Sequence, residues 1–331
     1  MVASPIFWFV YLDPLLKELR TKGIGCHIAC MYMGVVAYAN DIVLLAPNRN
    51  AARNMLATCE KYAIANNIMF STDVNPNKSK SKALYVVGHK GNSGKPAPLM
   101  LDGKELPWVD KCEHLGHTLN VTATMEQDCK IKRSKFIEDA VKLREQFKYA
   151  HPIEIINATE TYCSSHYGHN LWSLRGNASK MLYASWRTNI KLVWNLPRET
   201  RSYFVDHLLA AGVTPPSVSL MTRQLSFFHS LLNSVSPEAQ VLSRIAARDI
   251  RTTLGSNLAH IHTETGLDPW QFGGKRVRDD LLKYQKSEVS DKDRWRLKYL
   301  DKLLTQRLHQ FYNGSQSCEE LDALIHSLCI N

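Results

Sequence analysis

The first third of the chain combines helical periodicity with short apolar runs, which predicts a segment of mixed helices and strands. A helix is expected to begin at Ser4-Pro5, a cap followed by a first-turn proline, and to end before Gly23. Its leucines share one face, and Pro14 is expected to kink it. A second helix is predicted over 50–66. Runs of β-branched and other apolar residues predict strands at 31–38, 42–46, 83–87, 99–101, 104–106 and 113–120.

Beyond residue 121 the pattern becomes helical, and prolines separate the helical segments. We therefore predict an α+β fold in three parts. Antiparallel hairpins with helices are expected over 1–122, a helical domain over 123–254 and a helical tail over 255–331. Apolar side chains recur with the helical period over 125–149, 153–172, 178–194, 201–211 and 292–311.

Composition limits the classes of protein to which the chain can belong. Its 331 residues are 44% hydrophobic and 22% charged, values of a folded globular protein that exclude a disordered or collagen-like chain. Lysine and arginine outnumber aspartate and glutamate by 41 to 31, which favours a polyanionic partner. No apolar run approaches the ~18 residues of a membrane span, and none has the flanks of a signal peptide. We expect an intracellular protein, cytoplasmic and nuclear, that is neither secreted nor bound to a membrane.

Cysteine and histidine provide no metal-binding motif. The eight cysteines are scattered and form no Cys-x-x-Cys pair, so we interpret them as reduced core thiols. Cys163, His166 and His169 recur every three residues within the helix predicted over 153–172. Because no fourth ligand stands near them in the sequence, we interpret them as structural.

The turn Ala39-Asn40-Asp41, between two predicted strands, is the most informative segment for chemistry. A tight hairpin turn that carries an amide and a carboxylate holds both beyond the edge of the sheet. Such oxygens suit a hard cation such as Mg²⁺, and two cations about 4 Å apart support phosphoryl transfer. Taken alone, however, the segment is more typical of an ordinary turn.

Neighbouring segments change that interpretation. The segment 35–46, Val-Val-Ala-Tyr-Ala-Asn-Asp-Ile-Val-Leu-Leu-Ala, resembles the Tyr-x-Asp-Asp core of reverse transcriptases in the form found in non-LTR (LINE-type) retrotransposons. Further segments resemble the same family in the same order, from residue 4 to about residue 270. They are Ser-Pro-Ile-Phe at 4–7, Gly-Ile-Gly-Cys-His-Ile at 23–28, Phe-Ser-Thr-Asp at 70–73, Asn-Pro-Asn-Lys-Ser-Lys at 75–80, Leu-Pro-Trp-Val-Asp at 106–110, His-Leu-Gly-His at 114–117 and Leu-Pro-Arg at 196–198.

The resemblance implies the later palm, the primer grip and the thumb of such an enzyme, with roles for matched residues. Asp41 matches the second aspartate of the catalytic pair and is the implied metal ligand. Asn40 stands where the family has the first aspartate, its principal metal ligand. Lys78 matches a lysine thought to protonate the leaving pyrophosphate. The matched primer-grip residues are Leu115, Gly116 and His117.

The implied partners are an RNA template paired with a DNA primer, with deoxynucleotides as substrates and Mg²⁺ (or Mn²⁺) as the cofactor of the intact enzyme. Independently of the family, the helical region interleaves basic side chains with tryptophans and tyrosines. Cations follow phosphates and aromatic rings stack on bases, although the same aromatics are also spaced as core residues. Candidate nucleic-acid contacts are Lys80, Lys130, Lys132, Arg133, Arg187 and Lys191.

The chain also departs from the family. A neutral amide at Asn40 is expected to cost on the order of several kcal/mol of metal binding. The sequence starts within a palm motif, which in the family follows the fingers and another metal-binding aspartate. We therefore expect no polymerisation by this chain alone, and whether it binds metal stays open. Three hypotheses remain: a polymerase completed by a second chain, a non-catalytic module that binds RNA or RNA–DNA duplex, and a product without a selected function.

Overall fold

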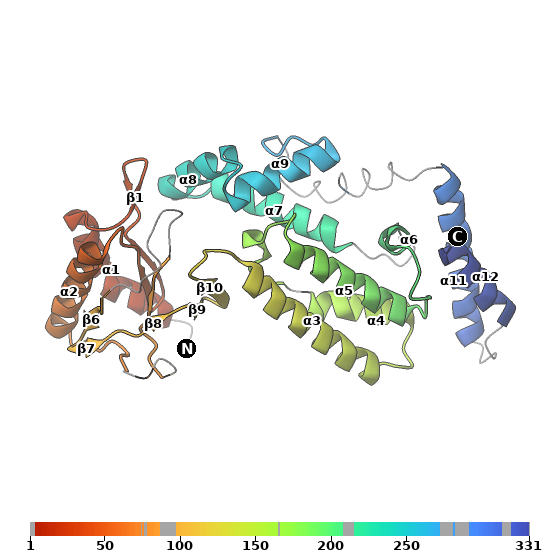
Figure 1. Cartoon of the computed structure of the whole chain (residues 1–331), viewed down its shortest axis with the longest axis horizontal. Coiled ribbons are helices and arrows are strands. Elements are labelled where there is room, and N and C mark those ends of the chain that lie inside the picture. Colours follow the sequence, from red (N-terminus) through yellow and green to blue (C-terminus); the bar gives the residue numbers. More distant parts are fainter. Residues whose placement is uncertain are drawn as a thin grey trace. The chain divides into compact units, whose positions relative to one another are not determined.

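The computed structural model describes residues 4–73, 75, 78–86, 97–164, 166–207, 215–271, 281, 291–312 and 319–330. The chain divides into two compact units, Met1–Thr124 (unit 1) and Met125–Asn331 (unit 2). Figure 1 shows unit 1 in red to yellow and unit 2 in yellow to blue. This division lies close to the boundary expected after residue 122. The expected separation of 123–254 from 255–331 stays a prediction.

Unit 1 combines two helices with short strands, as the sequence predicts. In its described part the strands pair two by two: β1–β2, β3–β4, β6–β7 and β9–β10 are antiparallel hairpins, whereas β5–β8 is a parallel pair that the sequence analysis did not predict. The elements are α1 (Ser4–Lys22), β1 (His27–Ile28), β2 (Met31–Tyr32), β3 (Val35–Tyr38), β4 (Asp41–Leu44), α2 (Arg49–Ala65), β5 (Ala83–Leu84), β6 (Met100–Leu101), β7 (Lys104–Glu105), β8 (Trp108–Val109), β9 (Lys111–His114) and β10 (His117–Asn120).

The two helices of unit 1 pack against each other through the apolar face that the leucine spacing predicts. α1 continues through Pro14, and α2 begins at the cap Asn48, whose side chain accepts a hydrogen bond from the Ala51 N–H at 2.9 Å. Burial of this face removes apolar surface from water and holds the helices together. The buried residues of this core are Leu12, Leu15 and Leu19 of α1 with Met55 and Cys59 of α2.

Gly25 allows the segment before β1 to approach the β3–β4 hairpin closely. Its φ is +150°, and a Cβ at this position would lie 2.6 Å from Gly34 Cα. The Cys26 N–H donates to the Leu45 carbonyl at 2.9 Å, and the Leu45 N–H donates to the Gly34 carbonyl at 2.7 Å. A side chain at Gly25 would push these backbones apart, so this glycine serves packing, whereas Gly23, with a φ of +62°, directly follows the end of α1.

In the described part of unit 2, every element of secondary structure is a helix, and turns and loops connect them. The single helix predicted over 153–172 is wrong. α4 is short and passes into a π-helical turn, and Gly168 with a φ of +81° precedes a 3₁₀ turn. The elements are α3 (Glu126–Gln146), α4 (Pro152–Ala158), η1 (Thr159–Cys163), η2 (His169–Leu171), α5 (Asn177–Val193), α6 (Ser202–His207), α7 (Pro216–Leu232), α8 (Pro237–Arg248), α9 (Thr253–Thr265), α11 (Asp291–Tyr312) and α12 (Glu319–Ile330).

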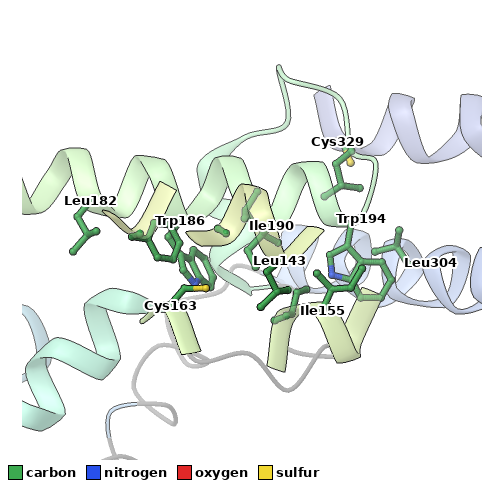
Figure 2. Close-up of a cluster of buried hydrophobic side chains, with 14 of the residues drawn as sticks. Leu143, Ile155, Cys163, Leu182, Trp186, Ile190, Trp194, Leu304 and Cys329 are labelled. Carbon is green, nitrogen blue, oxygen red and sulfur yellow. The ribbon is translucent and has the colours of Figure 1, made fainter. Parts of the chain in front are cut away.

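Two hydrophobic cores hold unit 2 together. In the first, α3 and α5 pack with α11 and α12, so the last two helices belong to the same core as the middle of the chain. Figure 2 shows Trp186, Ile190 and Trp194 lying among Leu143, Leu304 and Cys329 of that core. The second core joins α7 to α9 through Phe228 and Ile261.

The segment between η1 and α5 lies between these cores and is held by buried polar side chains. The Trp172 indole N–H donates to the buried Asp128 carboxylate of α3 at 2.9 Å. Asn257 of α9 donates to the Trp172 carbonyl at 2.8 Å and accepts from the Leu174 N–H at 2.9 Å. Gln224 of α7 donates to the carbonyl of His169 at 3.2 Å. The bonds of Asn257 and Gln224 satisfy backbone groups where the helix predicted over 153–172 is broken.

Candidate functional site

The β3–β4 hairpin carries the two residues on which the sequence hypothesis depends. Tyr38 pairs with Asp41, so Ala39 and Asn40 form the connecting turn. Ala39 has a φ of +52°, in the left-handed region that favours glycine or asparagine. Asn40 and Asp41 are exposed at the end of the hairpin, beside the exposed ring of Tyr38. An amide oxygen and a carboxylate therefore face solvent at this turn.

This turn supplies oxygen ligands that suit Mg²⁺, but only one of its two site residues is charged. Within the part of the chain that the structure describes, no three His, Cys, Asp or Glu side chains gather to hold a metal ion. Asp41 and Asn40 do not by themselves fit a two-metal centre, which needs several carboxylates between the cations. The metal expected at Asp41 stays a prediction.

Lys78 and Lys80 lie in the loop that follows α2. The Lys78 N–H donates to the Asn75 carbonyl at 3.0 Å, which closes a turn. Ser79 between the two lysines is buried, and its hydroxyl donates to the Ser81 carbonyl at 2.6 Å. The side chains of Lys78 and Lys80 are both exposed, so an anion in solution can reach them.

The primer-grip candidates Leu115, Gly116 and His117 lie at the β9–β10 hairpin, where His117 pairs with His114. Leu115 and Gly116 form the turn, with φ values of +49° and +73°. A leucine in the left-handed region is strained, since its Cβ crowds the backbone. The β9–β10 and β3–β4 hairpins are separate two-stranded sheets, so no common sheet carries the two turns.

On α3, the basic candidates differ in their surroundings. Lys130 is exposed and Lys132 is partly exposed. The Arg133 Nε donates to the Ser185 hydroxyl of α5 at 2.7 Å. Arg133 therefore joins two helices, and of these three Lys130 is the best placed to meet a phosphate.

On α5, the basic candidates serve internal contacts. Arg187 donates two hydrogen bonds to the Asp206 carboxylate, at 2.8 and 2.6 Å, and this pairing raises the pKa of the guanidinium. The Lys191 ammonium donates to the Arg198 carbonyl at 2.8 Å, and burial lowers its pKa. Both residues hold neighbouring segments in place, so their charges are not simply available to a ligand.

The tryptophans interleaved with these cations belong to the core. Trp172, Trp186 and Trp194 are at most 7% exposed. Their rings therefore pack in the core and are not available to stack on the bases of a nucleic acid. Sequence reasoning did not single out Trp270, an indole that is 39% exposed and has Arg248 over its ring. Its sequence neighbours, Asp268-Pro269 before it, carry no signal for exposure.

His166 and His169 are buried beside Trp172, in the segment where the predicted helix is broken. Burial is the main cause that lowers the pKa of each imidazole to about 4. Positive charge on Arg223 adds to the effect on both. Cys163 lies in the preceding π-helical turn and His169 in the following 3₁₀ turn, so the three residues do not lie on the single helix predicted over 153–172.

No protein-family model matches the chain, and no curated protein matches its sequence. The resemblance to reverse transcriptases therefore rests on the sequence motifs alone. Among the helices of the described residues, none combines the length and the apolar character that crossing a bilayer requires.

Proposed function

We propose that the chain derives from the reverse transcriptase of a non-LTR retrotransposon and does not synthesise DNA by itself. The observation that carries this proposal is the order of the motifs along the chain, centred on Tyr38-Ala39-Asn40-Asp41. Two features of unit 1 support it. Asn40 and Asp41 are exposed at a hairpin end, and the later Leu115-Gly116 pair also occupies a tight hairpin turn.

The lack of synthesis follows from the chemistry of the turn. Two divalent cations that stabilise a developing phosphoryl charge need negative ligands close by. Asn40 contributes a neutral oxygen, which leaves Asp41 as the one charged ligand at this hairpin end. In the proposal, an RNA template, a DNA primer and deoxynucleotides are the ligands of the intact enzyme, with Mg²⁺ or Mn²⁺ as its cofactor.

Primer extension by the 331-residue chain on an RNA template tests this proposal directly. With Mg²⁺ or Mn²⁺, we expect no extended primer. Extension that disappears in Asp41→Ala would contradict the proposal, because it would show a working centre at this turn. A template-dependent product that survives Asp41→Ala would instead indicate a contaminating polymerase, which a second purification step would remove.

A direct metal measurement separates the role of Asn40 from that of the fold. Tb³⁺ bound at the turn would be excited by the neighbouring exposed Tyr38. Asn40→Asp adds a second carboxylate, so Tb³⁺ should bind about fivefold to tenfold tighter at this solvent-exposed place. Asn67→Asp, an exposed asparagine after α2, is the matched control and should leave the affinity unchanged. Equal effects of the two variants would refute the assignment of the turn as a metal site.

A second candidate function is a non-catalytic module that binds RNA or RNA–DNA duplex, and the exposure of Lys130 on α3 favours it. Affinity for a duplex should fall with salt as counterions are released. Lys130→Glu should weaken binding about fivefold and reduce the salt slope by about one. Lys142→Glu, on the same helix but paired with Glu138, is the control. Equal binding by both variants would exclude this face of α3. Charge reversal at Arg187 would not test binding, because it also breaks the pairing with Asp206.

A further inference from the structure

Trp270 is a fixed, partly exposed aromatic ring that follows α9. The ring meets Phe228 of α7 edge to face, with centroids 5.0 Å apart. Its backbone N–H donates to the Asp268 carboxylate at 3.0 Å, and His229 of α7 bonds the Pro269 carbonyl at 3.1 Å. The packing and these bonds hold the indole in place although 39% of the residue remains exposed. A ring held in this way presents a surface that a ligand can use without ordering it first.

Two arginines of α8 give the surroundings of this ring a positive charge. The Arg248 guanidinium lies 5.7 Å from the ring centroid, within reach of a cation–π contact. Arg244 is exposed one turn earlier on the same helix. Neither arginine makes an ion pair with another described residue, whereas Arg251 bonds Asp249. We call Arg244, Arg248 and Trp270 the Trp270 face.

The carboxylates near the Trp270 face already have partners. Asp249 accepts from the Arg251 guanidinium at 2.7 Å, and Asp268 accepts from the Trp270 backbone. Asp249 is neutralised by Arg251, whereas Asp268 keeps its charge, because a backbone N–H carries none. Among the described residues of this face, the charges of Arg244 and Arg248 outweigh that single carboxylate and leave a positive balance. A partner that complements it carries negative charge together with flat apolar groups, the combination that nucleotides offer. A purely apolar protein partner would bury the two guanidinium groups without a counter-charge, which is costly.

We propose that the Trp270 face binds single-stranded nucleic acid, with one base stacked on the Arg248–Trp270 pair and a neighbouring phosphate at Arg244. Bases stack on aromatic rings and on guanidinium planes, and in a single strand they are free to do so. In a duplex the bases are already stacked on one another, so this face distinguishes a single strand from a duplex. This inference shares with the proposed function the assumption that the partner is a nucleic acid. It is otherwise independent, because it depends on other residues.

The test is the fluorescence anisotropy of a labelled single-stranded RNA of about 16 nucleotides, a length that covers one such site. The full chain is compared with Trp270→Ala, Trp270→Phe and Arg244→Glu. Tyr162→Ala, which removes an exposed aromatic ring of η1, is the matched control. Trp270→Ala should weaken binding of the single strand about fivefold to tenfold. Trp270→Phe should recover most of that affinity, because a phenyl ring also stacks.

Arg244→Glu keeps the proposal testable if Trp270→Ala disturbs the contact with Phe228 and lowers the melting temperature. Arg244 is exposed, so its reversal should weaken single-strand binding without affecting melting. Affinity for an RNA–DNA duplex should stay at the wild-type value in both variants. Single-strand binding equal to that of Tyr162→Ala in both would overturn the proposal.

Measurements on the wild-type chain separate this inference from the proposed function. Single-strand binding that depends on Trp270, without any duplex binding, supports the Trp270 face and contradicts the duplex-binding module. Duplex binding that depends on Lys130, without single-strand binding, supports the duplex-binding module and contradicts the Trp270 face. Self-association that Trp270→Ala removes, in a chain that binds no RNA, would identify the face as a protein interface and overturn the inference.

Discussion

The two units bury their apolar side chains in different ways. In unit 1 the strands are short and paired two by two, and its described residues form two small cores. In unit 2, long helices from the middle and the end of the chain pack into an extended core, part of which Figure 2 shows, and a second core lies beside α7 and α9. A helix satisfies its own backbone, whereas a two-stranded sheet leaves edges to solvent and is marginal alone. The candidate catalytic turn consequently lies in the more weakly packed unit, whereas Lys130 and the Trp270 face lie in the better packed one.

The burial of aromatic side chains marks the same contrast, although both units also expose large apolar residues. The first turns of α1 expose Phe7 and Val10, each more than 70% exposed, and Phe9 lies between them with more than half of its surface exposed. In unit 2, large aromatic residues such as Phe136 and Phe228 are almost fully buried. Because stability follows buried apolar surface, unit 1 should unfold at a lower urea concentration than unit 2.

The largest effect is expected from Trp186→Ala in the core of unit 2. Deleting this buried indole removes its packing and leaves a cavity, which should cost about 3–5 kcal/mol of unfolding free energy. Urea unfolding followed by circular dichroism measures the loss. Met181→Ala, on the exposed face of the same helix, should cost far less. Similar losses from the two would break the contrast between core and surface on α5.

Acid should weaken unit 2 through its buried histidines. Burial favours the neutral imidazole of His166 in the folded state, with a pKa of about 4 against about 6.5 unfolded. Above pH 6.5 this imidazole is neutral in both the folded and the unfolded chain, so it does not reduce the free energy of unfolding. As the pH falls from about 6.5 towards 4, the unfolded chain binds a proton that the folded chain does not, so about 3 kcal/mol is lost.

Urea unfolding between pH 7.5 and 4.5 measures this effect. His166→Gln should reduce the pH dependence without removing it, because His169 has a similarly lowered pKa, whereas replacement of the exposed His326 by glutamine should leave it unchanged. A dependence equally steep in wild type and His166→Gln would show that other groups cause the acid sensitivity.

A smaller loss is expected from Arg187→Ala. It removes the two hydrogen bonds that the guanidinium donates to the mostly buried Asp206 carboxylate, which should cost about 2 kcal/mol. Arg187→Lys should recover only part of this, because an ammonium cannot form the paired contact. Thermal unfolding measures both. Wild-type stability of Arg187→Ala would indicate that the pair is not structural and would restore Arg187 as a candidate nucleic-acid contact.

The smallest effect is expected in unit 1, from Leu115→Asn. Asparagine tolerates the left-handed backbone at this turn better than leucine, so stability should rise by about 0.5–1 kcal/mol. Urea unfolding of unit 1 measures the gain. Thr118→Asn, within β10, is the control and should not stabilise. A loss of stability in Leu115→Asn would show that the leucine side chain contributes packing that outweighs its strain.

Prediction from the sequence works where a local pattern is sufficient. The leucine spacing of α1, the helical periodicity of α2 and the turn at Ala39-Asn40 all act within a few residues, and each predicted element is found. It fails over 153–172, because Trp172 leaves the helical path to bond Asp128, which is 44 residues earlier. A local period contains no information about such a partner.

The local sequence pattern was sufficient to predict the α+β class, the helices α1, α2, α3, α5 and α11, and the pair Asn40-Asp41 at a hairpin end, whereas it did not predict α7, α8, α9 and α12. Which cationic side chains and aromatic rings are available to a ligand depends on the tertiary structure. Arg187 bonds Asp206 and Trp186 is buried, whereas Trp270 is exposed beneath Arg248. The physical reason is that charge and aromaticity belong to single residues, whereas availability depends on neighbours that folding brings from elsewhere in the chain.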